Sequence, residues 1–125
     1  VGEFVHWGAT SQDVMDTALV LLERESHQII LRDMKACLRH ALELARKYRN
    51  TVMAGRTHVV HAIPITFGYK AAVWADELGR GIERLEEIGK RLFVGEMSGA
   101  VGTLASQPDK GLDTQNGHFA GRPGL

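Results

Sequence analysis

Residues 11–48 read SQDVMDTALVLLERESHQIILRDMKACLRHALELARKY and contain neither glycine nor proline. Apolar side chains recur in this stretch at alternating steps of three and four residues, as they do on one face of an α-helix. They are Leu31, Met34, Leu38, Ala41, Ala45 and Tyr48. The pattern predicts one long helix, roughly 55 Å in length at about 1.5 Å per residue. Such a helix is longer than a small domain buries alone, so we expect it to pack against other helices.

A second helical pattern follows a β-prone segment. Residues 51–63 carry β-branched side chains on both sides of Gly55, which predicts a short hairpin or an extended crossing. Pro64 suits the first turn of a helix that runs to about Phe93. Glycines inside this helix favour close helix–helix approach or a bend; they are Gly79, Gly81 and Gly89. The predicted fold class is all-α, with two long antiparallel helices joined by an extended hairpin and packed into a larger bundle.

The last part of the chain differs in character. Residues 107–125 are rich in glycine and proline and poor in apolar side chains, which predicts a loop-like tail. Residues 1–106 are expected to form part of one helical domain. The sequence begins without an initiator methionine, within what looks like a motif, so we expect it to be an excerpt of a longer protein.

Composition excludes several classes of function. Fifteen basic and fifteen acidic residues give a formal net charge of zero, which argues against nucleic acid or an anionic membrane as a partner. No window approaches the roughly 20 apolar residues of a membrane span, and no signal-peptide pattern opens the chain. The single cysteine, Cys37, has no partner thiol and is expected to be a small core residue. These features predict a cytoplasmic protein.

The start of the first helix is a candidate anion site. Thr10 and Ser11 lie where free backbone N–H groups and the positive end of the helix dipole converge. Their hydroxyls could hold a carboxylate or a phosphate, and His6 could donate to the same anion. Alternatively, one hydroxyl only caps the helix.

The run Gly55-Arg56-Thr57-His58 supplies a candidate proton-transfer group. His58 can exchange a proton near neutral pH, and Thr57 is an uncharged donor beside it. His58 and His61 lie three apart in a segment predicted to be extended, which places them on opposite faces and argues against a metal site. We expect no metal and no cofactor, and acid–base chemistry on a carboxylic acid.

Three blocks together resemble the fumarase/aspartase superfamily, on its adenylosuccinate lyase and 3-carboxy-cis,cis-muconate cycloisomerase branch. They are His6-Trp7-Gly8-Ala9-Thr10-Ser11-Gln12-Asp13, Gly55-Arg56-Thr57-His58-Val59-Val60-His61-Ala62 with Pro64, and Ser98-Gly99-Ala100-Val101-Gly102-Thr103. The resemblance implies a homotetrameric helical bundle, active sites shared by three subunits, and β-elimination with release of fumarate from a small dicarboxylate substrate.

The resemblance also implies roles for individual residues. His58 matches the general acid toward the leaving nitrogen, Thr10, Ser11 and Thr57 match positions that contact substrate carboxylates, and His6 matches a histidine that lines the pocket. The family loop that carries the serine general base is absent from these 125 residues, so the piece alone is expected to be inactive.

Three functional readings stay open. The block at residues 98–103 favours adenylosuccinate lyase, which acts in purine biosynthesis, whereas Trp7 and Gln12 favour the cycloisomerase. A third reading, of a different class, is a helical assembly module without activity of its own. Its basis is the missing base loop together with long apolar stripes that one small monomer cannot cover.

Overall fold

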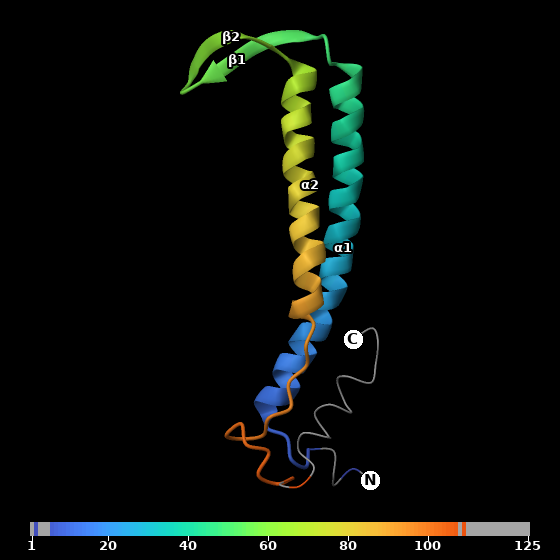
Figure 1. Ribbon diagram of the computed structural model, residues 1–125, viewed down its shortest axis with the longest axis vertical. Coiled ribbons are helices and arrows are strands. Elements are labelled where there is room, and N and C mark those ends of the chain that lie inside the picture. The colour runs from blue at the N-terminus through green and yellow to red at the C-terminus, as the bar shows by residue number, and fades with distance from the viewer. Residues whose placement is uncertain (1, 3–5, 108, 110–125) are drawn as a thin grey trace. The chain divides into compact units, whose positions relative to one another are not determined.

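The computed structural model describes residues 2, 6–107 and 109. Its elements are α1 (Ser11–Lys47), β1 (Val52–Thr57), β2 (Val60–Thr66) and α2 (Phe67–Leu92), in that order (Figure 1). The prediction of an all-α chain with a short hairpin between two long helices is confirmed. The predicted tail lies almost wholly outside the described residues, so the boundary at residue 106 stays a prediction.

The backbone divides into two units, residues 27–88 and residues 1–26 with 89–125. In the first unit α1 and α2 run antiparallel and side by side, and the hairpin joins them at one end (Figure 1). Few side chains are buried between them. The buried apolar residues of the described chain are Ala41, Ala71, Ala75 and Ile82. The interface is therefore thin and made mostly of small side chains.

Polar contacts also join the two helices within this unit. His27 Nε2 lies 2.8 Å from the Leu85 carbonyl oxygen, and Lys35 Nζ lies 2.6 Å from Glu86 Oε1. The Lys35–Glu86 pair is half-exposed, so it contributes little to stability. The position of α2 along α1 therefore depends mainly on packing.

The backbones approach each other closely where the hairpin meets the helices. A Cβ added to Gly68 would overlap the Arg49 Cα and would lie 2.6 Å from the Ala45 carbonyl oxygen. The Gly68 N–H donates to the Tyr48 carbonyl at 2.9 Å, and the Phe67 N–H donates to the Thr51 carbonyl at 2.8 Å. Because no side chain fits at residue 68, α2 begins directly on the backbone of the end of α1.

The glycines inside α2 have different surroundings. A Cβ on Gly81 would lie 2.8 Å from the terminal methyl of Met34, so the predicted close approach is confirmed there. A Cβ on Gly79 would meet no atom within 4 Å, so there is no close approach at that position, and the alternative of a bend there stays a prediction.

Two sequence predictions need correction. Pro64 does not open α2 but lies in β2 opposite Ala54, which is possible because both strands of a two-stranded sheet are edges. The helix begins at Phe67 instead, where the Thr66 hydroxyl accepts a hydrogen bond from the Tyr69 N–H at 3.1 Å. Cys37 is exposed in this chain and is not the core residue that the sequence predicts.

Within the described residues, no helix combines the length and apolar character needed to cross a membrane.

We predict opposite effects for alanine at two glycines of α2. Gly68→Ala should lower the free energy of unfolding by about 1–3 kcal/mol, because the new Cβ overlaps backbone that cannot move aside. Gly79→Ala, which meets open space in a helix, should raise it by up to about 1 kcal/mol. Urea unfolding followed by helix circular dichroism measures both. Equal effects of the two substitutions would contradict the close contact at Gly68.

Candidate functional site

The hairpin that carries Thr57 and His58 is irregular. The antiparallel register pairs Val52 with Thr66 at one end and Thr57 with Val60 at the other. Between Ala54 and Arg56 the register shifts by one residue. Gly55 is buried, and a Cβ there would overlap the Ile63 carbonyl oxygen. The shift is a β-bulge, a feature that bends a strand and changes the direction in which its tip points. The bulge and the close approach at Gly55 therefore set the direction in which the hairpin tip extends from the helices.

His58 and Val59 form the two-residue turn at the tip of the hairpin. Their φ angles are +33° and +61°, in the left-handed region that glycine and asparagine normally occupy in such turns. A β-branched valine in this region is strained, at a cost of order 1–3 kcal/mol. Val59 is 98% exposed, so its side chain recovers nothing by burial. The turn thus presents His58 at an exposed, strained position, and the sequence prediction that His58 lies in an extended segment is wrong.

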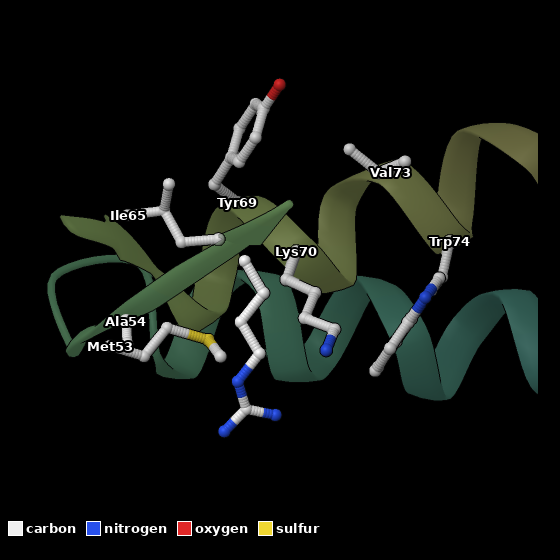
Figure 2. Close-up of a pocket in the computed structure, with 8 residues that line it drawn as sticks. Met53, Ala54, Ile65, Tyr69, Lys70, Val73 and Trp74 are labelled. Carbon is white, nitrogen blue, oxygen red and sulfur yellow. The ribbon is translucent and has the colours of Figure 1, made fainter. Parts of the chain in front are cut away.

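A hollow of about 220 Å³ lies between the hairpin and the first turns of α2 (Figure 2). It is lined by Met53, Ala54, Arg56, Ile65, Tyr69, Lys70, Val73 and Trp74. Lys70 Nζ lies 5.4 Å from the centre of the Trp74 ring, a cation–π contact. Among the described residues neither Arg56 nor Lys70 pairs with a carboxylate. The hollow next to the candidate catalytic hairpin is therefore positively charged.

The second group of predicted site residues lies at the start of α1, in the other unit. His6 belongs to a turn in which its carbonyl oxygen accepts from the Ala9 N–H at 3.2 Å, and its side chain is exposed. The Thr10 N–H donates to Asp13 Oδ2 at 3.0 Å, so Asp13 caps the helix by reaching back three residues. The hydroxyls of Thr10 and Ser11 make no hydrogen bond to any residue that the structure describes.

Asp13 also holds the glycine-rich segment at residues 98–103. The Gly99 N–H donates to Asp13 Oδ2 at 2.9 Å, and the Ser98 hydroxyl donates to Asp13 Oδ1 at 3.0 Å. One turn further along α1, the Thr17 hydroxyl donates to the Glu96 carbonyl at 3.3 Å and accepts from the Glu96 N–H at 3.0 Å. Asp13 and Thr17 therefore fix the incoming segment to the same face of α1.

The Asp13 carboxyl is nearly inaccessible, with a residue exposure of 2%. Burial alone would raise its pKa, but the backbone N–H groups of Thr10 and Gly99 and the Ser98 hydroxyl outweigh burial and hold the pKa below its ordinary value of 3.8. The side chain is thus a buried carboxylate whose charge is stabilised by hydrogen bonds from Thr10, Ser98 and Gly99. The spacing from Thr10 to Asp13 signals the cap in the sequence, but no sequence signal links Asp13 to residues 98 and 99, which are far along the chain.

The predicted site residues fall into two groups, one in each unit. His6, Thr10 and Ser11 lie around the start of α1, and Thr57 and His58 lie at the hairpin tip. In the described part of the chain, no three histidine, cysteine, aspartate or glutamate side chains gather as metal ligands would.

Comparison with known proteins assigns the family. The sequence model of a family described as lyase matches residues 1–111. The chain therefore belongs to this lyase family, the fumarase/aspartase superfamily.

Two relatives in sequence have names that denote different activities. N-acetyl-S-(2-succino)cysteine lyase of Enterococcus italicus is 50% identical over 114 residues, which are 91% of this chain and 25% of that protein. Adenylosuccinate lyase of Pyrococcus abyssi is 49% identical over 114 residues, again 91% and 25%. The chain thus spans about a quarter of the length of these relatives.

Solved structures show the same arrangement of elements. A fumarate lyase from Mesorhizobium sp. superposes with a TM-score of 0.88 at 53% identity, over 92% of this chain and 27% of the other. The β-carboxy-cis,cis-muconate cycloisomerase of Acinetobacter calcoaceticus superposes with a TM-score of 0.86 at 44% identity, over 88% and 26%. The fold of this segment is therefore shared by proteins with different names.

We predict that Asp13 makes stability depend on pH in the acid range. Because its folded pKa is lowered, the charged side chain contributes stability that is complete above the unfolded pKa of 3.8 and is lost as the pH falls through the folded pKa. The difference in unfolding free energy between the wild type and Asp13→Asn should be constant from about pH 7 to about pH 5 and should shrink below about pH 4.

Denaturant titrations at each pH measure this difference. Glu96 Oε1 lies 3.2 Å from the Ser98 hydroxyl oxygen and competes with Asp13 for its single proton. The wild type and Asp13→Asn should therefore also be compared in a Glu96→Gln background. A difference that grows as the pH falls would contradict the lowered pKa of Asp13.

Proposed function

We propose that the intact protein containing this chain is a cytoplasmic lyase that releases fumarate by β-elimination from a succinyl adduct, with adenylosuccinate as the leading substrate. The observation that carries the proposal is the position of His58, which is exposed beside Thr57 at a strained hairpin tip in a chain of this family. Strain of this kind tends to be kept where a position serves function.

The proposed reaction breaks one C–N bond. A base removes a proton from the carbon next to the substituted carbon, and the electron pair forms the C=C bond of fumarate. The C–N electron pair passes to nitrogen, which His58 protonates as it leaves. A neutral amine then departs without developing a full negative charge, which is the purpose of a general acid.

The succinyl group carries two carboxylates that must be held while this proton transfer occurs. Thr10 and Ser11 support a role in binding one of them, because their hydroxyls are unused by the described residues and lie at the positive end of α1. Thr57 is proposed to contact a carboxylate as well, and His6 to line the pocket. Arg56 and Lys70 add positive charge beside the hairpin, which favours an anionic substrate.

A second candidate substrate is N-acetyl-S-(2-succino)cysteine, favoured by the 50% identity to a lyase of that name. The same elimination would then break a C–S bond. A thiolate has a pKa near 8.5 and leaves more readily than an amide-like nitrogen anion, so this substrate needs less help from an acid. Dependence on His58 therefore distinguishes the two candidates.

Self-association is also proposed, as a homotetramer with shared active sites. Large apolar side chains of α1 are more than half exposed in the single chain. They include Val14, Met15, Leu19, Leu22 and Ile29. Light scattering of the intact protein is the direct check, and a stable monomer would contradict this part of the proposal.

The test of the proposed function is an assay of the intact protein with both succinyl adducts, read by fumarate release, and with 3-carboxy-cis,cis-muconate, read by consumption of the muconate. Adenylosuccinate should yield AMP and fumarate, and His58→Gln should lower kcat for it by about 10²–10⁴-fold with the fold intact. The loss should be smaller for the sulfur substrate. Turnover of muconate without fumarate would instead identify a cycloisomerase, and normal turnover by His58→Gln would remove the acid assignment.

A second prediction separates binding from capping at Ser11. Since Asp13 caps the helix, Ser11→Ala should leave the melting temperature almost unchanged. If the hydroxyl binds a substrate carboxylate, KM should rise by roughly tenfold or more, the equivalent of a hydrogen bond to a charged group worth about 1.5–3 kcal/mol. Kinetics and thermal melts on the same preparation measure both. A lower melting temperature with unchanged KM would assign Ser11 a purely structural role.

A further inference from the structure

The start of α1 is held in an unusual way. A threonine at the residue before a helix normally uses its hydroxyl to accept a backbone N–H of the first turn. Here the Thr10 hydroxyl has no partner among the described residues, and the stabilising contact is the Asp13 carboxylate on the Thr10 N–H. Asp13 thus does the capping and leaves both neighbouring hydroxyls unoccupied.

The same carboxylate joins the helix start to a second segment. Asp13 Oδ2 accepts from both the Thr10 N–H and the Gly99 N–H, at 3.0 and 2.9 Å. A single oxygen therefore fixes the distance between the first turn of α1 and residue 99. Gly99 has φ +77°, and a Cβ there would lie 3.2 Å from the Gly8 carbonyl oxygen, so the segment lies close against the turn that contains His6.

We propose that Asp13 is a positioning residue for the carboxylate-binding site. Asp13 caps α1 and also accepts hydrogen bonds from Ser98 and Gly99, an arrangement that we call the clasp. The clasp fixes the first turn of the helix and keeps the Thr10 and Ser11 hydroxyls available to substrate. The inference rests on the proposed function for the identity of the ligand, whereas the clasp itself rests on the hydrogen bonds of Asp13. Asp13 is not proposed to touch substrate.

The charge of Asp13 is stabilised by hydrogen-bond donors that the protein itself supplies. Two backbone N–H groups and one hydroxyl point at its oxygens, and they hold it inside the protein. Losing the carboxylate would leave these donors unpaired and would free residues 98 and 99 from the helix. The first turn of α1 would then fray, and the two hydroxyls would lose their fixed positions.

Three variants of the intact protein test the proposal. Asp13→Ala removes the clasp and should raise KM for the succinyl substrate by on the order of tenfold to a hundredfold, with a smaller change in kcat. Asp13→Asn should restore most of the affinity, because its amide oxygen can accept both N–H groups while its NH₂ donates to Ser98. Thr17→Val removes two hydrogen bonds to the same segment without touching the helix start, and should change stability but not KM.

Hydrogen exchange gives a readout that does not need activity. The Gly99 amide should exchange at least tenfold faster in Asp13→Ala than in the wild type, and at a nearly normal rate in Asp13→Asn. If Asp13→Ala fails to fold, Gly99→Ala loosens the clasp from the other side, since alanine is strained at φ +77°, and should raise KM in the same way.

The outcomes separate the two claims. If the wild type releases no fumarate from either adduct, the proposed function fails, and the clasp is judged by Gly99 exchange alone, where equal rates would overturn it. If the wild type is active, an unchanged KM in folded Asp13→Ala overturns the positioning role. An equal rise in KM in Thr17→Val, or an Asp13→Asn variant as impaired as Asp13→Ala, overturns it too, because general loosening or the charge itself would then be responsible.

Discussion

The hairpin depends on the contact between Gly68 and the last turn of α1. Both ends of the hairpin are tied at that contact, through the Phe67 N–H on the Thr51 carbonyl and the Gly68 N–H on the Tyr48 carbonyl. Backbone hydrogen bonds fix the end of the hairpin that adjoins the helices. The direction of the strands therefore does not depend on the side chains at the tip. His58 can therefore sit exposed at the end of two short strands and still have a defined position relative to α2.

In the unit at residues 27–88, the two helices bury little apolar surface between them. Alanines at 41, 71 and 75 allow the helices to lie close, but they contribute a small apolar area each. Larger apolar side chains of this unit remain exposed on α1, among them Ile29 at 51%. A helical pair with so thin a core buries little apolar surface of its own.

Local signals in the sequence predict the helices well and the polar contacts poorly. The start of α1 at Ser11 and its end near Tyr48 are marked by caps and by the absence of glycine and proline, and the structure ends α1 at Lys47. The prediction that Pro64 opens the second helix is wrong because proline is equally compatible with an edge strand and with a first helical turn. The prediction that His58 lies in an extended segment is wrong because its β-branched neighbours indicate a strand, whereas the register of the hairpin places His58 in the turn.

The hydrogen bonds of Asp13 to distant residues cannot be predicted from local sequence patterns. Its cap on Thr10 is a contact over three residues and is visible in the sequence, but its bonds to Ser98 and Gly99 cross more than 80 residues. The family model matches residues 1–111 as one range, and this match does not explain why the three blocks occur together. The structure supplies a reason for two of them: the first and the third meet at one carboxylate.

Departures from local preference concentrate at the two candidate site regions. Val59 adopts φ +61° at the hairpin tip without burial, and Asp13 is a carboxylate hidden from water at the helix start. A sequence selected for stability alone would place Asn-Gly at that turn and would use the Thr10 hydroxyl as the cap. Each departure instead leaves a functional group exposed or unoccupied: the imidazole of His58 in one unit, the hydroxyls of Thr10 and Ser11 in the other. Natural sequences tend to break local rules at functional sites, so these two places are where the chemistry is expected.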